Sequence, residues 1–180
     1  KKMFETAIEL QKGILNSTDT IDDKQSKIKQ LQQLASIYFK YYVHQALVKA
    51  GLGNNYLNWL DIWRKNMELG LTTWGEDSNV ESTRSDCHAW GASPNIEFFR
   101  TILGIDSDSP NFKTVKIEPH LGEISQIGGE IPHPSGIISV KYDTSKKKEA
   151  EIILPEKITG KFIWKGLDYD LQGGKNIIRL

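Results

Sequence analysis

Residues 70–94, which read GLTTWGEDSNVESTRSDCHAWGASP, are the most informative part of this chain. The segment carries two tryptophans, a histidine, an arginine and several carboxylates, and it joins two apolar, helix-like segments. A short polar turn normally makes such a connection. A long link rich in aromatic and ionisable groups instead favours the wall of a binding cleft, where apolar faces and a few polar groups recognise a ligand. Tryptophan beside carboxylate suits a sugar, because the ring stacks on C–H groups while the carboxylate binds hydroxyls or carries protons.

Apolar periodicity before this segment predicts helices. Over roughly residues 23–49, apolar side chains recur at steps of three and four, which places them on one face of a single helix. These side chains are Ile28, Leu31, Ala35, Tyr38, Tyr42 and Ala46. A second helix is predicted to begin at Asn54 or Asn55 and to end at Gly70. Another helix is expected over residues 1–15.

A third helix is predicted from Asp86, as its cap, to Leu103. Pro94 lies inside that range, so a kink or break is expected there, with Ser93 capping the continuation. On the second helix, Trp59 and Trp63 are spaced i, i+4, and core packing explains them better than a ligand does.

The character of the chain changes after residue 105. Short β-branched segments parted by Gly, Pro, Asp and Lys turns predict an antiparallel β-sandwich, so a domain boundary is placed near residue 106. The candidate strands are 113–117, 124–130, 136–142, 150–154, 160–165 and 175–179.

Composition excludes several function classes. The chain has 23 basic and 23 acidic residues, whereas a nucleic-acid surface needs a large basic excess. The basic run at residues 146–148 is interpreted as a solvated hairpin tip. No apolar run is long enough to predict a transmembrane helix, and no membrane partner is expected. Cys87 is the single cysteine, so no internal disulfide is expected.

Glu76 is the strongest candidate for a catalytic carboxylate. It follows Trp74 and Gly75, beyond a predicted helix end where a carboxylate is mildly unfavourable because the helix dipole is negative there. A solvent-exposed loop glutamate is an equally good interpretation of the residue alone. Glu81 is an alternative carboxylate, as is Asp77, and Arg84 is expected to pair with a carboxylate and hold the loop.

His88 and Trp90 are candidates for ligand contacts in the first turns of the third helix. A structural histidine is the competing interpretation. Cys87 and His88 are adjacent, and no further histidine or cysteine lies at ligand spacing, so no metal site is predicted.

Five motifs, taken in order, resemble a known family. They are GLTTWGE (70–76), SDCHAWGASP (85–94), ILGI (102–105), VKIEPHLG (115–122) and GGEIPHPSG (128–136). Their order and spacing resemble the C-terminal end of bacterial α-L-rhamnosidases of glycoside hydrolase family 78, from about residue 30 to residue 142. One departure is visible: many members have Trp directly before the glutamate, whereas here Gly75 lies between Trp74 and Glu76.

The resemblance implies an α+β multidomain architecture. Residues 1–105 would be the last helical hairpins of an (α/α)6 barrel, and residues 106–180 the C-terminal β-sandwich. The family mechanism is inverting: one carboxylic acid protonates the leaving oxygen and a second carboxylate activates water. The match places the general base at Glu76 and sugar contacts at His88, Trp74 and Trp90. It implies no cofactor.

The same resemblance implies that the chain is one part of a longer enzyme. The general acid and most sugar-binding carboxylates of the family lie upstream, so the isolated chain is expected to be inactive on its rhamnose-containing glycoside or polysaccharide. Helices made to pack on absent neighbours would leave an apolar face, through which a homodimer is expected. A periplasmic or extracellular location is favoured over a cytoplasmic one.

Two alternatives remain open at this point. One is another (α/α)6-barrel glycosidase with a different sugar specificity. The other is a non-catalytic carbohydrate-binding module, which needs exposed aromatics along one face of a sheet. The predicted sandwich offers Phe112, Tyr142, Phe162, Trp164 and Tyr169.

Overall fold

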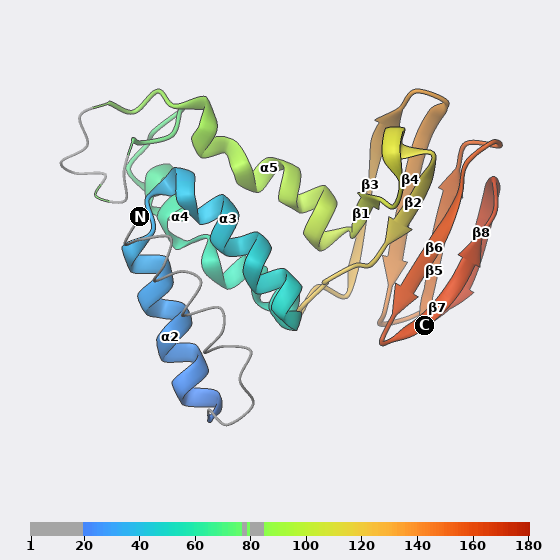
Figure 1. Cartoon of the computed structure of the whole chain (residues 1–180), viewed down its shortest axis with the longest axis horizontal. Helices are drawn as coiled ribbons and strands as arrows, with labels where there is room; N and C mark the ends of the chain where they lie inside the picture. The colour runs from blue at the N-terminus through green and yellow to red at the C-terminus, as the bar shows by residue number, and fades with distance from the viewer. Residues whose placement is uncertain (1–19, 77–78, 80–84) are drawn as a thin grey trace. The chain divides into compact units, whose positions relative to one another are not determined.

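The computed structural model describes residues 20–76, 79 and 85–180 (Figure 1). The chain divides into two compact units, one ending at Asn95 and one beginning at Ile96. The first is helical and the second is mostly β-structure, and each is described by itself. The predicted helix over residues 1–15 lies outside the described residues. The domain boundary predicted near residue 106 stays a prediction.

The predicted single helix over residues 23–49 is wrong, because the chain breaks in its middle. The first piece is α2 (Ile21–Leu34), which begins with a capping box between Thr20 and Asp23. Its last residue is followed by Ala35 in an extended conformation (φ −81°, ψ 130°). Ser36 then caps α3 (Ile37–Leu47), its hydroxyl accepting from the amide of Phe39 at 3.3 Å.

The break changes which side of α3 is buried. Ile37, Lys40, Val43, His44 and Leu47 face the interior of the unit. Tyr38 and Tyr42, which the single-helix prediction placed on the buried stripe, are instead 50% and 48% exposed. The two residues between the helices do not continue the helical rotation, so the stripe read before the break does not carry on after it.

The second predicted helix is also divided. A π turn (Val48–Leu52) contains Gly51 at φ 82°, and a 3-10 segment (Gly53–Trp59) leads into α4 (Asp61–Glu68). The predicted start at Asn54 or Asn55 is therefore wrong, because helical turns begin before both. Gly70, at φ 78°, follows the end of α4 as predicted. Trp59 and Trp63 are buried, which confirms their assignment to the core.

The third predicted helix begins two residues later than expected. A 3-10 turn (Ala89–Ala92) leads into α5 (Ser93–Glu97), and a π turn (Phe98–Ile102) follows. The capping position belongs to His88, not to Asp86. Pro94 produces no break: it lies in the first turn of α5, where its missing N–H costs nothing.

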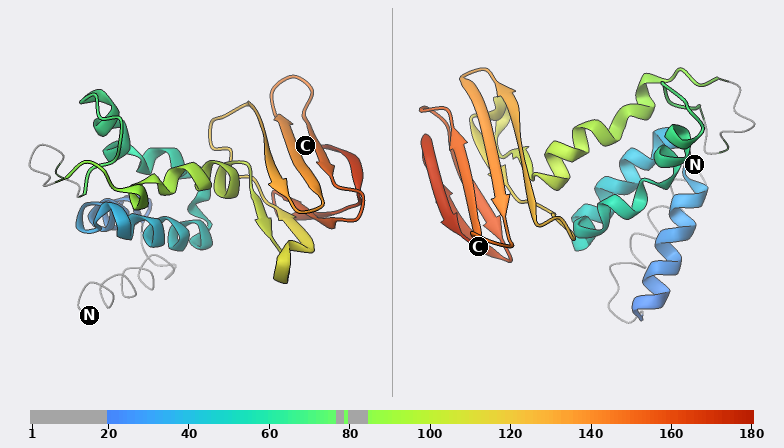
Figure 2. Two further views of the ribbon diagram at one scale, coloured as in Figure 1. Left: turned by 90° about the horizontal axis from the view of Figure 1, so that it is seen from above. Right: turned by 180° about the vertical axis from the view of Figure 1, so that it is seen from behind.

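The second unit contains two four-stranded sheets, ordered β1-β2-β6-β7 and β3-β4-β5-β8 (Figures 1 and 2). Their strands are β1 (Ile105–Ser107), β2 (Thr114–Ile117), β3 (Gln126–His133), β4 (Gly136–Asp143), β5 (Glu149–Leu154), β6 (Thr159–Trp164), β7 (Leu167–Leu171) and β8 (Gly174–Arg179). The six predicted strands are confirmed to within three residues at each end, whereas β1 and β7 were not predicted.

One strand pair departs from the antiparallel prediction. β2 and β6 are parallel, and all other pairs are antiparallel. β3, β4 and β5 lie in the other sheet, so the chain leaves the first sheet after β2 and returns to it at β6. A parallel pair needs such a long crossover connection, which local periodicity does not reveal.

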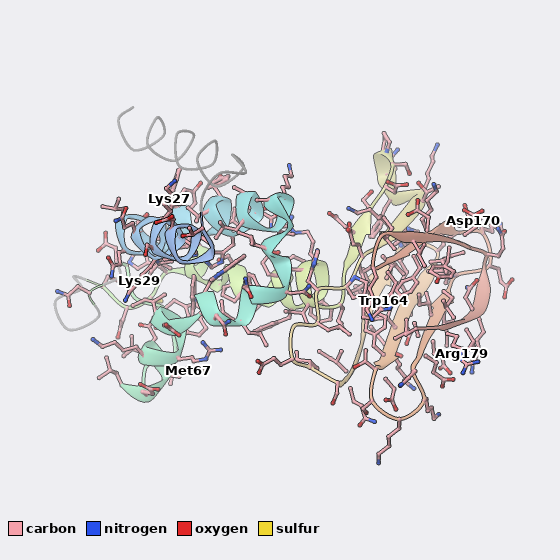
Figure 3. All side chains as sticks on the ribbon, turned by 90° about the horizontal axis from the view of Figure 1, so that it is seen from below. Lys27, Lys29, Met67, Trp164, Asp170 and Arg179 are labelled. Atoms are coloured by element: carbon pink, nitrogen blue, oxygen red, sulfur yellow. The ribbon has the colours of Figure 1, made fainter. Side chains whose placement is uncertain are left out.

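The core of this unit comes from alternate positions of the strands. β2 alternates half-buried and buried residues, with Val115 and Ile117 fully buried. They belong to a continuous cluster with Val140, Ile152 and Phe162, among others. Trp164 packs against the same cluster and is labelled among the side chains of the β unit in Figure 3.

The helical turns after Ile96 are fixed to the sheets by tight backbone contacts. Gly104 has φ 77°, and a side chain there would overlap the peptide between Glu118 and Pro119. The Glu118 amide donates to the Gly104 carbonyl at 2.9 Å. The buried Tyr142 hydroxyl donates to the Leu103 carbonyl at 2.8 Å. These contacts explain why the unit begins before the first strand.

Candidate functional site

Two segments of the 70–94 region pair through their backbones. The Glu76 amide donates to the Ser85 carbonyl at 2.9 Å, and the His88 amide donates to the Trp74 carbonyl at 3.2 Å. The two bonds align residues 74–76 with residues 85–88 in opposite directions. Glu76 and His88, twelve positions apart in sequence, are therefore held on neighbouring backbone segments.

The same pairing accounts for Asp86, which was wrongly predicted to cap the third helix. Its side chain is exposed, and its backbone carbonyl accepts a hydrogen bond from the Thr73 hydroxyl. Helical turns start only after His88, whose backbone is extended (φ −122°, ψ 105°). Because residues up to His88 pair with residues 74–76, they cannot also coil into the first turn of a helix.

Gly91 anchors the paired segments to α4. The indole N–H of the buried Trp63 donates to the Gly91 carbonyl at 2.6 Å. A Cβ placed on Gly91 would lie 2.6 Å from the Cβ of Trp74 and 3.5 Å from a methyl carbon of Ile37. The absence of a side chain thus lets Trp74 approach the 3-10 turn (Ala89–Ala92) closely. Trp74 is half-buried in this position.

An aromatic row extends from the candidate site along α3. The His88 ring lies 4.6 Å from the Trp90 ring, and Trp90 meets Tyr38 edge-on at 6.0 Å. Tyr38 contacts Tyr42 at 5.8 Å, and their hydroxyls lie 3.2 Å apart, which raises the pKa of Tyr42. Trp90 is 38% exposed. Sequence reasoning missed both tyrosines as site neighbours, although their i, i+4 spacing was visible.

The polar groups of the site are accessible to different degrees. Glu76 is half-buried at the end of its paired segment. The Nε2 atom of His88 is buried and has no hydrogen-bond partner among the described residues. A buried ring nitrogen normally has a partner, so this atom is suited to a ligand hydroxyl. The arrangement offers a carboxylate, an imidazole nitrogen and apolar ring surface.

Other candidates take no part in this geometry. Glu81, Arg84 and Asp77 lie outside the described residues. Cys87 is exposed. Within residues 20–76, 79 and 85–180, no group of three or more His, Cys, Asp or Glu side chains could hold a metal ion. In the same ranges, no helix combines the length and apolar character needed to cross a membrane.

Fold and site together define an α+β protein that has a helical unit, which carries the paired segments and their aromatic side chains, and a two-sheet β unit. No protein-family model matches the chain. No curated protein matches it in sequence. Solved structures do match it, and several of them are α-L-rhamnosidases.

The α-L-rhamnosidase of Aspergillus terreus has a TM-score of 0.70 at 16% identity, over 88% of this chain and 22% of that one. A family 78 rhamnosidase of Bacillus sp. GL1 has a TM-score of 0.60 at 21% identity, over 84% and 18% of the two chains. The Streptomyces avermitilis α-L-rhamnosidase, solved with L-rhamnose, has a TM-score of 0.68 at 14% identity, over 86% and 19%.

These matches confirm the motif resemblance at the level of the fold. This chain spans about a fifth of the length of the matching structures. It has the fold of one part of an α-L-rhamnosidase.

Proposed function

We propose that this chain is the C-terminal part of an inverting α-L-rhamnosidase, with Glu76 as the general base. Residues 1–105 would contribute the last hairpins of an (α/α)6 barrel, and His88, Trp74 and Trp90 would contact the sugar. The observation that carries the proposal is the backbone pairing that holds Glu76 beside the His88 segment, in a fold shared with several rhamnosidases. The Nε2 of His88, buried and without a partner in the part of the chain that the structure describes, supports a ligand at that place.

In the proposed reaction, the oxygen of a water molecule attacks the anomeric carbon of rhamnose while Glu76 accepts a proton from that water. A carboxylic acid elsewhere in the longer protein donates a proton to the leaving oxygen. His88 Nε2 would bind a sugar hydroxyl, and Trp90 would cover an apolar sugar face. Because inversion needs both carboxyl groups, the 180-residue chain alone is proposed to turn over no rhamnoside, and measurable activity of the isolated chain would contradict this part.

The test is Glu76→Gln in the full-length protein that carries this chain. The amide keeps the shape of the side chain but cannot accept the proton, so turnover should fall by about 10²–10⁴-fold while substrate still binds. Glu68→Gln, at the exposed end of α4, is the matched control and should leave turnover unchanged.

A second variant separates a lost base from a disturbed fold. In Glu76→Ala, added azide can occupy the vacated space and attack the anomeric carbon without a base. Azide should then restore release of the leaving group and form a rhamnosyl azide of inverted configuration. If Glu76→Gln keeps most of its activity, the base lies elsewhere, and Glu81 is the next residue to substitute.

The choice of sugar is part of the proposal and is tested with a panel of aryl glycosides. Faster hydrolysis of another glycoside than of the α-L-rhamnoside would favour the alternative barrel glycosidase. The carbohydrate-binding alternative gains no support, because the five aromatic side chains considered for it are buried or pack against the core of the β unit. Tyr142 and Phe162 are buried, and Phe112, Trp164 and Tyr169 lie against the core cluster.

A further inference from the structure

A cavity of about 670 Å³ lies in the helical unit between α2, α3, the 3-10 segment (Gly53–Trp59) and α4. This volume falls within the usual range of small-molecule sites. Trp74, Glu76, His88 and Trp90 do not line it, so the cavity is independent of the proposed function. Ile28, Ile62 and Trp59 give it apolar walls.

Lys40 places a buried cation in the cavity lining. Its side chain is only 4% exposed, and its ammonium has one hydrogen-bond partner among the described residues, the Gln32 carbonyl. An ammonium has three N–H donors, so donor capacity remains. Desolvation lowers the pKa of Lys40 to about 8, which still leaves most of the amine charged at pH 7. Burying such a group is costly unless an anion or acceptor completes its coordination.

Gln32 supplies a second donor beside it. Its side-chain oxygen lies 3.2 Å from the Nε2 of His44 and accepts from that nitrogen in the tautomer that carries the proton there. Its Nε2 is buried without a hydrogen-bond partner in the described part of the chain. Lys40 and Gln32 therefore both belong to the cavity lining, and each carries a donor that the described residues leave incompletely satisfied.

The charge of the lining as a whole has the same sign as the Lys40 ammonium. Lys29 and Lys65 are exposed lining residues, and Lys29 is labelled on α2 in Figure 3. Among the described residues of the lining, Asp61 is the one carboxylate; it is exposed and lies 3.1 Å from the Arg64 guanidinium. Three lysines and one aspartate give the described lining a net positive formal charge, which favours anions over neutral or cationic ligands.

We propose that this cavity binds a small anion-bearing molecule, a carboxylate or a phosphate, between the Lys40 ammonium and the Gln32 side-chain amide. The anionic group accepts from both donors, and the apolar remainder of the ligand lies against Trp59. The site needs no covalent step and no metal. Whether the anion binds can be tested independently of rhamnoside hydrolysis.

The experiment is calorimetric titration of the 180-residue chain with three probes: inorganic phosphate, D-glucuronate and D-glucose. Glucuronate carries a carboxylate on the same ring as glucose, so this pair isolates the charge, and phosphate tests the anion without a ring. Glucuronate, phosphate or both should bind, and glucose should not. Equal binding of glucuronate and glucose, together with no binding of phosphate, would overturn the proposal.

Three variants locate the binding. Lys40→Met removes the buried charge at similar length, so it should stay folded and weaken anion binding about tenfold or more. Lys49→Met removes an exposed charge outside the lining and should change binding less than about twofold. Gln32→Glu puts a carboxylate where the free amide was. It should abolish anion binding while pairing with Lys40.

Circular dichroism confirms folding of each variant before titration. If Lys40→Met fails to fold, Gln32→Glu decides the matter, because it adds no volume and supplies the buried ammonium with a counterion. Unchanged anion affinity in either folded variant would show that the anion binds elsewhere and would contradict the proposed site.

Discussion

Gly91→Ala tests how the candidate site is assembled. Whether it lowers or raises the free energy of unfolding tells whether Trp74 packs closely against Gly91. An added Cβ would lie 2.6 Å from the Cβ and 3.2 Å from the Cγ of Trp74. Both atoms belong to the base of a side chain, so relief requires a backbone shift. Overpacking of this kind costs about 1–3 kcal/mol. In a helical turn without the contact, Ala would instead stabilise by about 0.5–1 kcal/mol relative to Gly.

The assay is urea unfolding followed by tryptophan fluorescence, with the free energy taken from the midpoint and slope. Gly91→Ala should lower the free energy of unfolding by about 1–3 kcal/mol. Trp74→Ala keeps the clashing Cβ, so the penalty should persist in that background. Trp74→Gly removes it, so the penalty should disappear. A stabilised Gly91→Ala protein, or an equal penalty in both backgrounds, would refute the close approach of Trp74 to Gly91.

Two further predictions concern buried polar groups. Tyr142→Phe leaves the Leu103 carbonyl without its 2.8 Å donor, so calorimetry should show that the free energy of unfolding falls by about 1–2 kcal/mol. The control is Tyr169→Phe, whose side chain is only half-buried and whose free energy of unfolding should fall by less than about 0.5 kcal/mol. Burial, and then the nearby Lys40 charge, lowers the pKa of His44 to about 3. Between that pKa and the ordinary value of 6.5, the unfolded state binds more protons, so stability falls as the pH falls. The loss from pH 7 to pH 5 should be about 2 kcal/mol, at about 1.4 kcal/mol per pH unit below 6.5. His44→Gln should remove that dependence, and an unchanged slope in this variant would contradict the neutral buried His44.

Strands were predictable where alternation and turn chemistry agreed. β5 alternates buried and less buried positions and follows the basic turn at residues 146–148, which is exposed as predicted. β7 was missed because only Leu171 among its five residues is buried, so its pattern carries little periodicity. The two-residue turn before it, Lys165–Gly166, has positive φ at both positions and was a hairpin signal in the sequence.

Helix existence was predictable, but helix continuity was not. Apolar residues recur at steps of three and four from Ile28 to Ala46, although the helix breaks at Ala35. The spacing is the same on both sides of the break, so it does not reveal the break. Ser36 is a preferred capping residue, and its bond to the Phe39 amide starts a new helix. A capping residue within an apolar pattern outweighs periodicity when tertiary packing rotates the two pieces differently. The exposed tyrosines of α3 follow from that rotation.

The candidate site shows where local reasoning ends. Residues 70–94 supplied Glu76, His88 and the two tryptophans as candidates through their residue types, and the family resemblance supplied their proposed roles. The role of Gly91 depends on contacts with Trp63, Trp74 and Ile37, which lie between 17 and 54 positions away in sequence. In the sequence Gly91 resembles any glycine beside a helical turn. Only the packing of α4 and Trp74 around it shows that a missing side chain positions the segment bearing the proposed base.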